Sequence, residues 1–215
     1  MRAATSCLAG HPNKLCDQIA DAVVDTFLRE DRHTRLSLHV LGSPGMMLIA
    51  GKVRTRADFD CATIATHIYH EVGYTDELDV FVNLEFLRDH AGQQQLWQTQ
   101  PVQVIGFACR DSKDLLPRPI VLAHSLARHI DHLRMTDPSM KWLLPDGSVS
   151  VLFKEDRPDL ISLHVTHHAD IHVQDVRSLL FDRLLKGFEG SSVSLSVNPE
   201  GPRSVAGFGV RSGMR

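Results

Sequence analysis

The sequence lacks the features that mark membrane, nucleic-acid-binding and disulfide-rich proteins. Its 215 residues contain no run of 18 apolar residues, so we expect no membrane-spanning helix. The formal net charge of −3 at pH 7 lacks the basic excess that is typical of nucleic-acid-binding proteins. The four cysteines are scattered without C-x-x-C spacing, and residues 1–7 contain no apolar signal-peptide segment. We therefore expect a cytoplasmic protein with reduced thiols and with no membrane or nucleic-acid partner.

The composition is typical of a globular protein, and the hydrophobic pattern predicts an order of helices and strands that occurs twice. With 43% hydrophobic and 23% charged residues, the chain can bury a sizeable core. Apolar residues four apart predict helices, and alternation with period 2 predicts strands. Thr55 and Asp58 are the predicted N-terminal caps of the second helix, and Gly73 is its predicted stop. The predicted order helix, strand, strand, helix, strand occupies residues 12–29, 36–40, 46–53, 61–72 and 79–84.

The same order of elements returns after Pro119. The predicted elements of this second unit cover residues 122–133, 148–154, 161–166, 173–184 and 193–197. The predicted fold class is therefore α+β, with two αββαβ units whose mainly antiparallel sheets carry helices on one face. We expect the opposite face of each sheet to be apolar and to be covered by the other sheet or by a partner. The predicted divisions are a first unit with a loop at 1–100, a second unit at 101–198 and a Gly- and Arg-rich tail at 199–215.

The most informative segment is Gly10–Gln18, which contains the sequence Gly-His-Pro-Asn-Lys. Pro12 is expected at the first position of the helix, where free backbone N–H groups form an anion-binding end. His11 and Lys14 flank that end, and Lys14 adds a positive charge. The pattern predicts a phosphate contact, and an ordinary helix start on the surface is the alternative interpretation.

The same segment resembles the GHPDK signature of the S-adenosylmethionine synthetases (methionine adenosyltransferases), which are transferases of one-carbon metabolism. The similarity extends in order over most of the chain. The segments that carry it are Gly10–Gln18, Gly45–Val53, Glu71–Tyr74, Ile105–Ala108, Ile120–His124 and Trp142–Gly147. The resemblance implies a fold of three αββαβ units, of which the third is absent from this chain. It also implies dimers that bury flat sheet faces and form active sites between subunits.

The resemblance further implies a reaction in which the sulfur of L-methionine displaces triphosphate from ATP. The triphosphate is then hydrolysed to phosphate and diphosphate, with Mg²⁺ and K⁺ as cofactors. Charge accumulates on the leaving triphosphate, so such a site needs cationic side chains and metal ions. His11 stands at the family's catalytic histidine, and His11, Lys14 and Asp146 stand at nucleotide-binding positions.

Several positions depart from the family pattern. Asn13 replaces the aspartate that holds Mg²⁺, and a neutral amide oxygen is a weak ligand for that hard cation. Lys52 replaces the glutamate that holds the methionine ammonium group, and Ser148 replaces a lysine. His39 replaces the glutamate associated with K⁺. Further changes fall at residues 93–98, 99–103 and 203, which stand at the family's mobile gate, glycine-rich motif and conserved aromatic residue.

These substitutions predict an S-adenosylmethionine synthetase-like protein with impaired catalysis. Catalysis is expected to be impaired because each replaced group contributes several kcal/mol to one transition state. We expect weak ATP binding around His11, Lys14 and Asp146, and exclusion of methionine by the reversed charge at Lys52. The alternatives are a divergent but active synthetase, a non-catalytic nucleotide-binding or regulatory partner, and the product of a decayed gene. The expected assembly is a homodimer, or a heterodimer with a complete synthetase.

Overall fold

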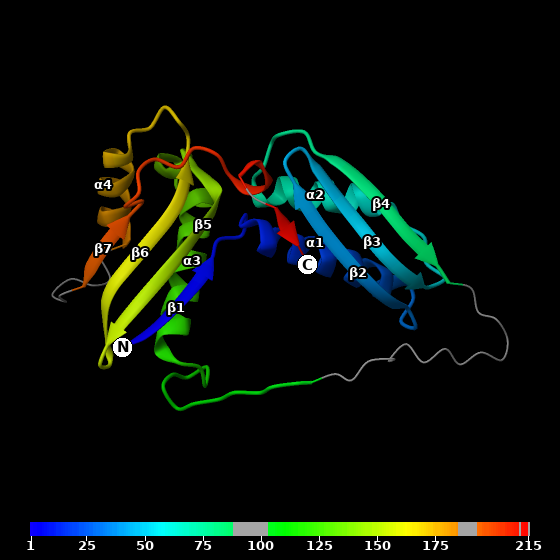
Figure 1. Cartoon of the computed structure of the whole chain (residues 1–215), viewed down its shortest axis with the longest axis horizontal. Coiled ribbons are helices and arrows are strands. Elements are labelled where there is room, and N and C mark those ends of the chain that lie inside the picture. The colour runs from blue at the N-terminus through cyan, green and yellow to red at the C-terminus, as the bar shows by residue number, and fades with distance from the viewer. Residues whose placement is uncertain (88–102, 185–192, 211, 215) are drawn as a thin grey trace.

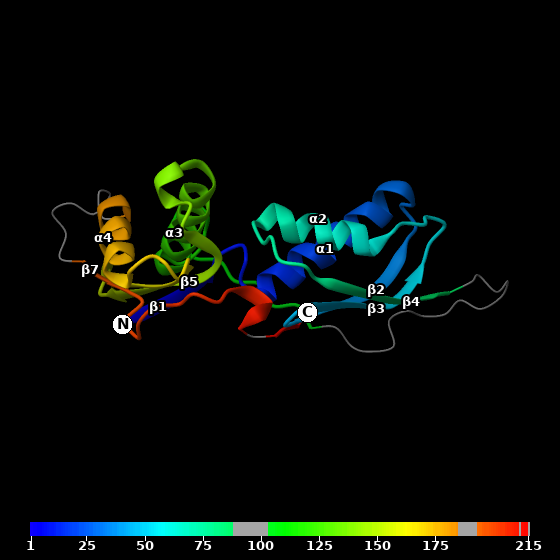
Figure 2. The same cartoon turned by 90° about the horizontal axis from the view of Figure 1, so that it is seen from above.

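The computed structural model describes residues 1–87, 103–184, 193–210 and 212–214. It contains two lobes, each made of one sheet and two long helices (Figure 1). The helices of both lobes lie on the same side of the molecule, so the opposite faces of both sheets point to the other side (Figure 2). Each lobe has its own hydrophobic core between its sheet and its helices. No helix within the described ranges is both long and apolar enough to cross a membrane.

The first unit has the predicted order of elements. Apolar residues recur at every fourth position of α1 and are all buried, which fixes the face that packs on the sheet. The β2–β3 hairpin is antiparallel, whereas β4 pairs with β3 in parallel. The elements are α1 (Pro12–Glu30), β2 (Arg35–Ser43), β3 (Met46–Arg54), α2 (Cys61–Val72) and β4 (Asp79–Phe86).

The predicted N-terminal caps of α2 are wrong, whereas the predicted stop is confirmed. The cap is Asp60, whose carboxylate accepts hydrogen bonds from the backbone of Ala62 and Thr63. Thr55 is instead hydrogen-bonded to Thr34, so it belongs to the preceding turn. Gly73 ends the helix with a φ of 110°, a backbone conformation that glycine adopts without steric cost.

The second unit repeats this architecture, with longer strands than predicted. Its two hairpin strands begin several residues earlier than the predicted 148 and 161, and Lys154 pairs with Arg157, so the hairpin turn is shorter than predicted. The β5–β6 hairpin is antiparallel and β7 pairs with β6 in parallel. The elements are α3 (Arg118–Thr136), the short 3₁₀ helix η1 (Pro138–Met140), β5 (Leu143–Lys154), β6 (Arg157–His167), α4 (Val173–Leu184) and β7 (Ser194–Val197).

The two ends of the chain each add a strand to the sheet of the other unit. Strand β1 (Arg2–Cys7) pairs with β5, so residues from the range predicted for the first unit complete the second sheet. After a 3₁₀ turn, η3 (Gly207–Gly209), strand β8 (Gly213–Met214) pairs with β2 of the first sheet. The resulting orders are β1-β5-β6-β7 and β4-β3-β2-β8. The sequence prediction missed both terminal strands. The predicted division near residue 100 falls outside the described residues.

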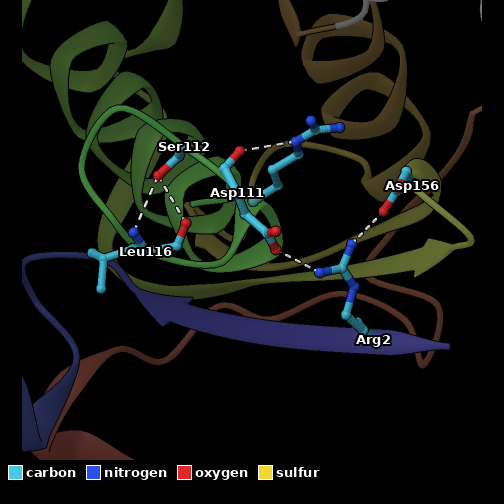
Figure 3. Close-up of polar contacts among 6 residues, drawn as sticks. Arg2, Asp111, Ser112, Leu116 and Asp156 are labelled. Carbon is cyan, nitrogen blue, oxygen red and sulfur yellow. Dashed lines mark hydrogen bonds and ion pairs between the residues drawn. The ribbon is translucent and has the colours of Figure 1, made fainter. Parts of the chain in front are cut away.

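An arginine holds the first strand to the segment that precedes α3. The guanidinium of Arg2 lies 2.6 Å from a carboxylate oxygen of Asp111 and 2.6 Å from one of Asp156 (Figure 3). The hydroxyl of Ser112 donates to the carbonyl of Leu116 and accepts from its N–H, which closes a compact turn (Figure 3). These contacts fix the chain between the two units against the edge of the second sheet.

The faces of the sheets that no helix covers are more polar than we expected. The open face of the second sheet carries hydroxyl groups, including a 2.8 Å hydrogen bond between Thr5 and Ser150. The open face of the first sheet carries one apolar row, in which Leu41, Leu48 and Phe81 are paired across neighbouring strands. Charged and polar residues lie beside that row. The expectation of apolar faces is therefore confirmed only for this row.

Candidate functional site

The Gly-His-Pro-Asn-Lys segment begins α1, as predicted. His11 is the N-terminal cap, and its Nδ1 accepts a 3.3 Å hydrogen bond from the backbone N–H of Asn13. Pro12 occupies the first turn, where its missing N–H has no cost. The Nζ of Lys14 donates to the carbonyl of Cys7 at 3.1 Å. The local sequence thus builds a helix end with a cationic side chain beside it.

This helix start is held directly against strand β5 of the other unit. The N–H groups of Leu8 and Gly10 donate to the carbonyls of Gly147 and Pro145, at 2.9 and 3.1 Å. A Cβ atom at Gly10 would lie 2.4 Å from the Cβ of Pro145, so only glycine fits this approach. The structure therefore brings His11 and Lys14 to the junction where Asp146 lies, although they are far apart in sequence.

Asp146 itself is 1% exposed. Its Oδ2 accepts a 3.2 Å hydrogen bond from the N–H of Gly207, and its carbonyl accepts one from the hydroxyl of Thr166 at 2.7 Å. The carboxylate therefore ties the returning C-terminal segment to β5. Because the side chain of Asp146 is buried and hydrogen-bonded, this geometry favours a role in positioning the junction over direct contact with a ligand.

Three further junction residues carry polar contacts that the sequence interpretation did not single out. The hydroxyl of Tyr74 donates to the carbonyl of Gly10 at 2.6 Å, and burial together with the charge of Asp146 raises the pKa of the Tyr74 hydroxyl. An Nη atom of Arg134 donates to the carbonyl of Val72 at 2.7 Å. Tyr74 was part of the resembling segments, whereas Arg134 had no sequence signal beyond its place on a helix.

Asp131 is the third of these residues. Its Oδ2 accepts a 2.9 Å hydrogen bond from the N–H of Ala9, while its buried Oδ1 has no hydrogen-bond partner within the described part of the chain. Burial raises the pKa of the Asp131 carboxyl, and the charges of Arg134 and Lys14 oppose that rise. A groove of about 530 Å³ runs past these groups between α1, α2 and α3.

Two other predicted positions lie elsewhere, on the open face of the first sheet. The Nζ of Lys52 lies 3.1 Å from a carboxylate oxygen of Glu85 on the neighbouring strand. His39 and Asn83 line the same shallow hollow, whose volume is about 360 Å³. Ser148 lies on the other sheet, paired with Cys7 and His164. The structure therefore brings together His11, Lys14 and Asp146, and places His39 and Lys52 in a second location.

No group of three potential metal ligands of the His, Cys, Asp or Glu type is close enough to hold an ion, within the ranges that the structure describes. Asn13 is exposed at the helix start and offers a neutral amide. Its surroundings therefore do not fit a Mg²⁺ site. Residues 93–98 lie outside the described residues, and of residues 99–103 only Gln103 is described.

Two pseudo-repeated αββαβ units, each with a mainly antiparallel sheet that carries helices on one face, define an α+β fold of two related units. The chain belongs to the S-adenosylmethionine synthetase family. Residues 1–88 match the N-terminal domain of S-adenosylmethionine synthetase, and residues 98–202 match its central domain.

Curated relatives named S-adenosylmethionine synthase extend this similarity. The protein from Treponema denticola is 28% identical over 92% of this chain and 58% of its own length. The one from Aquifex aeolicus is 26% identical over 96% of this chain and 60% of its own length. The one from Salinibacter ruber is 30% identical over 92% of this chain and 58% of its own length. The chain thus spans about three fifths of the length of these relatives.

Proposed function

We propose that this protein is a synthetase-like, nucleotide-binding member of its family whose catalysis of S-adenosylmethionine formation is impaired. The observation that carries the proposal is Lys52, a cation at the position where the resemblance implies a glutamate for the methionine ammonium. Its Nζ is paired with Glu85 at 3.1 Å on an open sheet face. Two cations about 4 Å apart repel by about 4 kcal/mol at an effective dielectric constant of 20. Methionine is therefore disfavoured at this position.

The metal positions support the same proposal. Mg²⁺ and K⁺ are cofactors that the family implies, but Asn13 and His39 replace the two carboxylates expected to hold them. Neither side chain supplies the negative charge that a hard cation prefers.

The junction supports the nucleotide-binding part of the proposal. His11 and Lys14 lie half-buried at a helix start whose N–H groups and dipole favour a phosphate group. We assign them direct contact with the phosphates of ATP, and we assign Asp146 a positioning role because it is buried against Gly207. The protein would then act in the cytoplasm as a regulatory or binding partner, and a decayed gene product is the competing proposal.

Calorimetric titration of the purified protein with ATP and with methionine tests the proposal. We expect measurable ATP binding at low salt and no heat from methionine. Lys14→Ala should weaken ATP binding by about tenfold, because a charge-assisted hydrogen bond contributes about 1.5–3 kcal/mol. Ser148→Lys should strengthen it, and Lys113→Ala, at an exposed position outside the junction, should change nothing.

A different result would refute the junction as the site. If ATP binds the parent protein and neither Lys14→Ala nor Ser148→Lys alters the dissociation constant, the nucleotide binds elsewhere. Thermal unfolding of each variant separates this outcome from a loss of folding, since Lys14 also donates to the carbonyl of Cys7.

A further inference from the structure

A basic hollow lies at the end of the first unit that is remote from the second unit. It forms where α1 ends, β2 begins, and β3 and β4 end, at the far side of that lobe (Figure 1). Its volume is about 690 Å³. We call it the arginine pocket, because its lining includes Arg32, Arg35, Arg54, Arg56, His33 and Phe86. None of these residues belongs to the junction or to the hollow around Lys52.

Among the described residues that line the pocket, Asp31 is the one carboxylate, and it is hydrogen-bonded to its own surroundings. Asp31 accepts hydrogen bonds from the backbone N–H groups of His33 and Arg56, both at 2.9 Å. It also accepts a 3.4 Å hydrogen bond from the hydroxyl of Thr55. These contacts bind the turn after α1 to the chain after β3, so the backbone of the pocket is fixed without using a guanidinium group.

Three of the pocket arginines, in contrast, have no carboxylate paired with them among the residues that the structure describes. Within the described part of the chain, no carboxylate lies within ion-pair distance of Arg32, Arg35 or Arg56. The register of the hairpin places Arg35 directly opposite Arg54. Like charges at directly opposed strand positions are unfavourable. This concentration of positive charge stands in a protein whose formal net charge is −3.

We propose that the arginine pocket binds a small anion that carries several phosphate groups. Guanidinium groups bind phosphate oxygens in pairs of parallel hydrogen bonds, and they keep their charge at any physiological pH. Several such groups around one cavity match a chain of linked phosphates better than a single anion. Phe86, whose side chain is 53% exposed, adds an apolar surface to the lining.

Calorimetric titration with inorganic tripolyphosphate tests this site. The titration uses Lys14→Ala protein, so that any binding at the junction is weakened and the two sites are distinguished. The double variant Arg32→Gln/Arg56→Gln should bind tripolyphosphate at least about tenfold more weakly. The matched control is Arg29→Gln, in the last turn of α1 and outside the pocket lining, which should leave the affinity unchanged. Affinity should also fall steeply as salt is raised.

Three outcomes would overturn the proposal. The first is no detectable binding of tripolyphosphate by a folded Lys14→Ala protein. The second is an equal loss of tripolyphosphate affinity in the double pocket variant and in Arg29→Gln, which would indicate a general effect of charge. The third is a single-stranded oligonucleotide that binds through the same arginines about tenfold more tightly than tripolyphosphate, which would assign the pocket to nucleic acid. If the double variant unfolds, the single variant Arg35→Gln replaces it.

Discussion

At the scale of single residues, the junction combines a cationic helix start with a buried acid. Asp131 has a backbone hydrogen bond on one oxygen and no partner for the other among the described residues. Its pKa is raised mainly because burial disfavours the charged form. An acid with a raised pKa in the folded state binds its proton more tightly there than in the unfolded chain. Its contribution to stability therefore decreases as pH rises from the ordinary aspartate pKa towards the raised value.

The replacement Asp131→Asn tests this prediction. The amide keeps the size of the side chain and cannot ionise, so it removes the pH-dependent contribution. Urea unfolding at pH 4 and pH 7 gives the free energy of unfolding of each protein. The value for the parent protein minus the value for the variant should be larger at pH 4 than at pH 7. Identical pH dependence of the two free energies of unfolding would contradict the assignment. Asp137→Asn, at a carboxyl whose pKa is lowered by hydrogen bonds to Ser139, should give a difference of the opposite sign.

The sequence predicted the residues of the site that depend on local structure. His11 and Lys14 were predictable because a Pro-containing helix start has a local signature. Tyr74 meets Gly10 through packing within the first unit, and Asp131 meets Ala9 through packing between the units, at sequence separations of 64 and 122. Periodicity carries no information on such contacts. The burial of Asp146 was equally hidden, because its partner Gly207 lies in the segment predicted as a tail.

At the scale of elements, the αββαβ order followed from periodicity, and the two terminal strands did not. The helices of the first unit agree with the predicted ranges within one residue and its hairpin strands within three, because their buried faces repeat regularly. Strand β1 has only Ser6 buried, and β8 has two residues, so neither shows an alternating hydrophobic pattern. Their positions depend on pairing with strands that are distant in sequence.

The C-terminal segment is the element whose packing is most easily tested. Phe208 is 1% exposed and lies 6.1 Å, between ring centroids, from Tyr69 in a stacked arrangement. A Cβ atom at Gly42 would lie 2.0 Å from the Phe208 ring, so the ring fills the space above that glycine. Phe208→Ala should lower the free energy of unfolding by about 3–5 kcal/mol.

Chemical denaturation measures this loss. The control is Phe107→Ala, at a side chain that is 71% exposed, which should leave the free energy of unfolding nearly unchanged. A Phe208→Ala variant as stable as the parent protein would mean that the segment does not pack on the first unit in solution.

At the scale of the whole molecule, the helices occupy one side and the open sheet faces occupy the other (Figure 2). The first of these faces carries the apolar row of Leu41, Leu48 and Phe81, and the side chain of Phe81 is 53% exposed. An exposed apolar row on a flat sheet is typical of a surface that pairs with a second subunit. We therefore predict a homodimer that buries this row.

Light scattering at micromolar concentration tests the dimer. Phe81→Lys should convert the protein to a monomer, because it places a charge in the row. Phe181→Lys, on α4 at a side chain that is 51% exposed, should leave the dimer intact. A well-behaved parent monomer, with no mixed complex when a complete synthetase is added, would contradict the prediction.

We expect that this synthetase-like protein does not make S-adenosylmethionine efficiently, because Lys52, Asn13 and Ser148 stand where the family resemblance implies groups that the reaction uses. The direct measurement is the formation of S-adenosylmethionine from ATP and methionine, with Mg²⁺ and K⁺ present, alongside the Aquifex aeolicus relative. We predict turnover more than tenfold below that of the relative, and in practice no detectable product. Turnover within about tenfold of the relative would contradict it, since losses of several kcal/mol correspond to far larger factors.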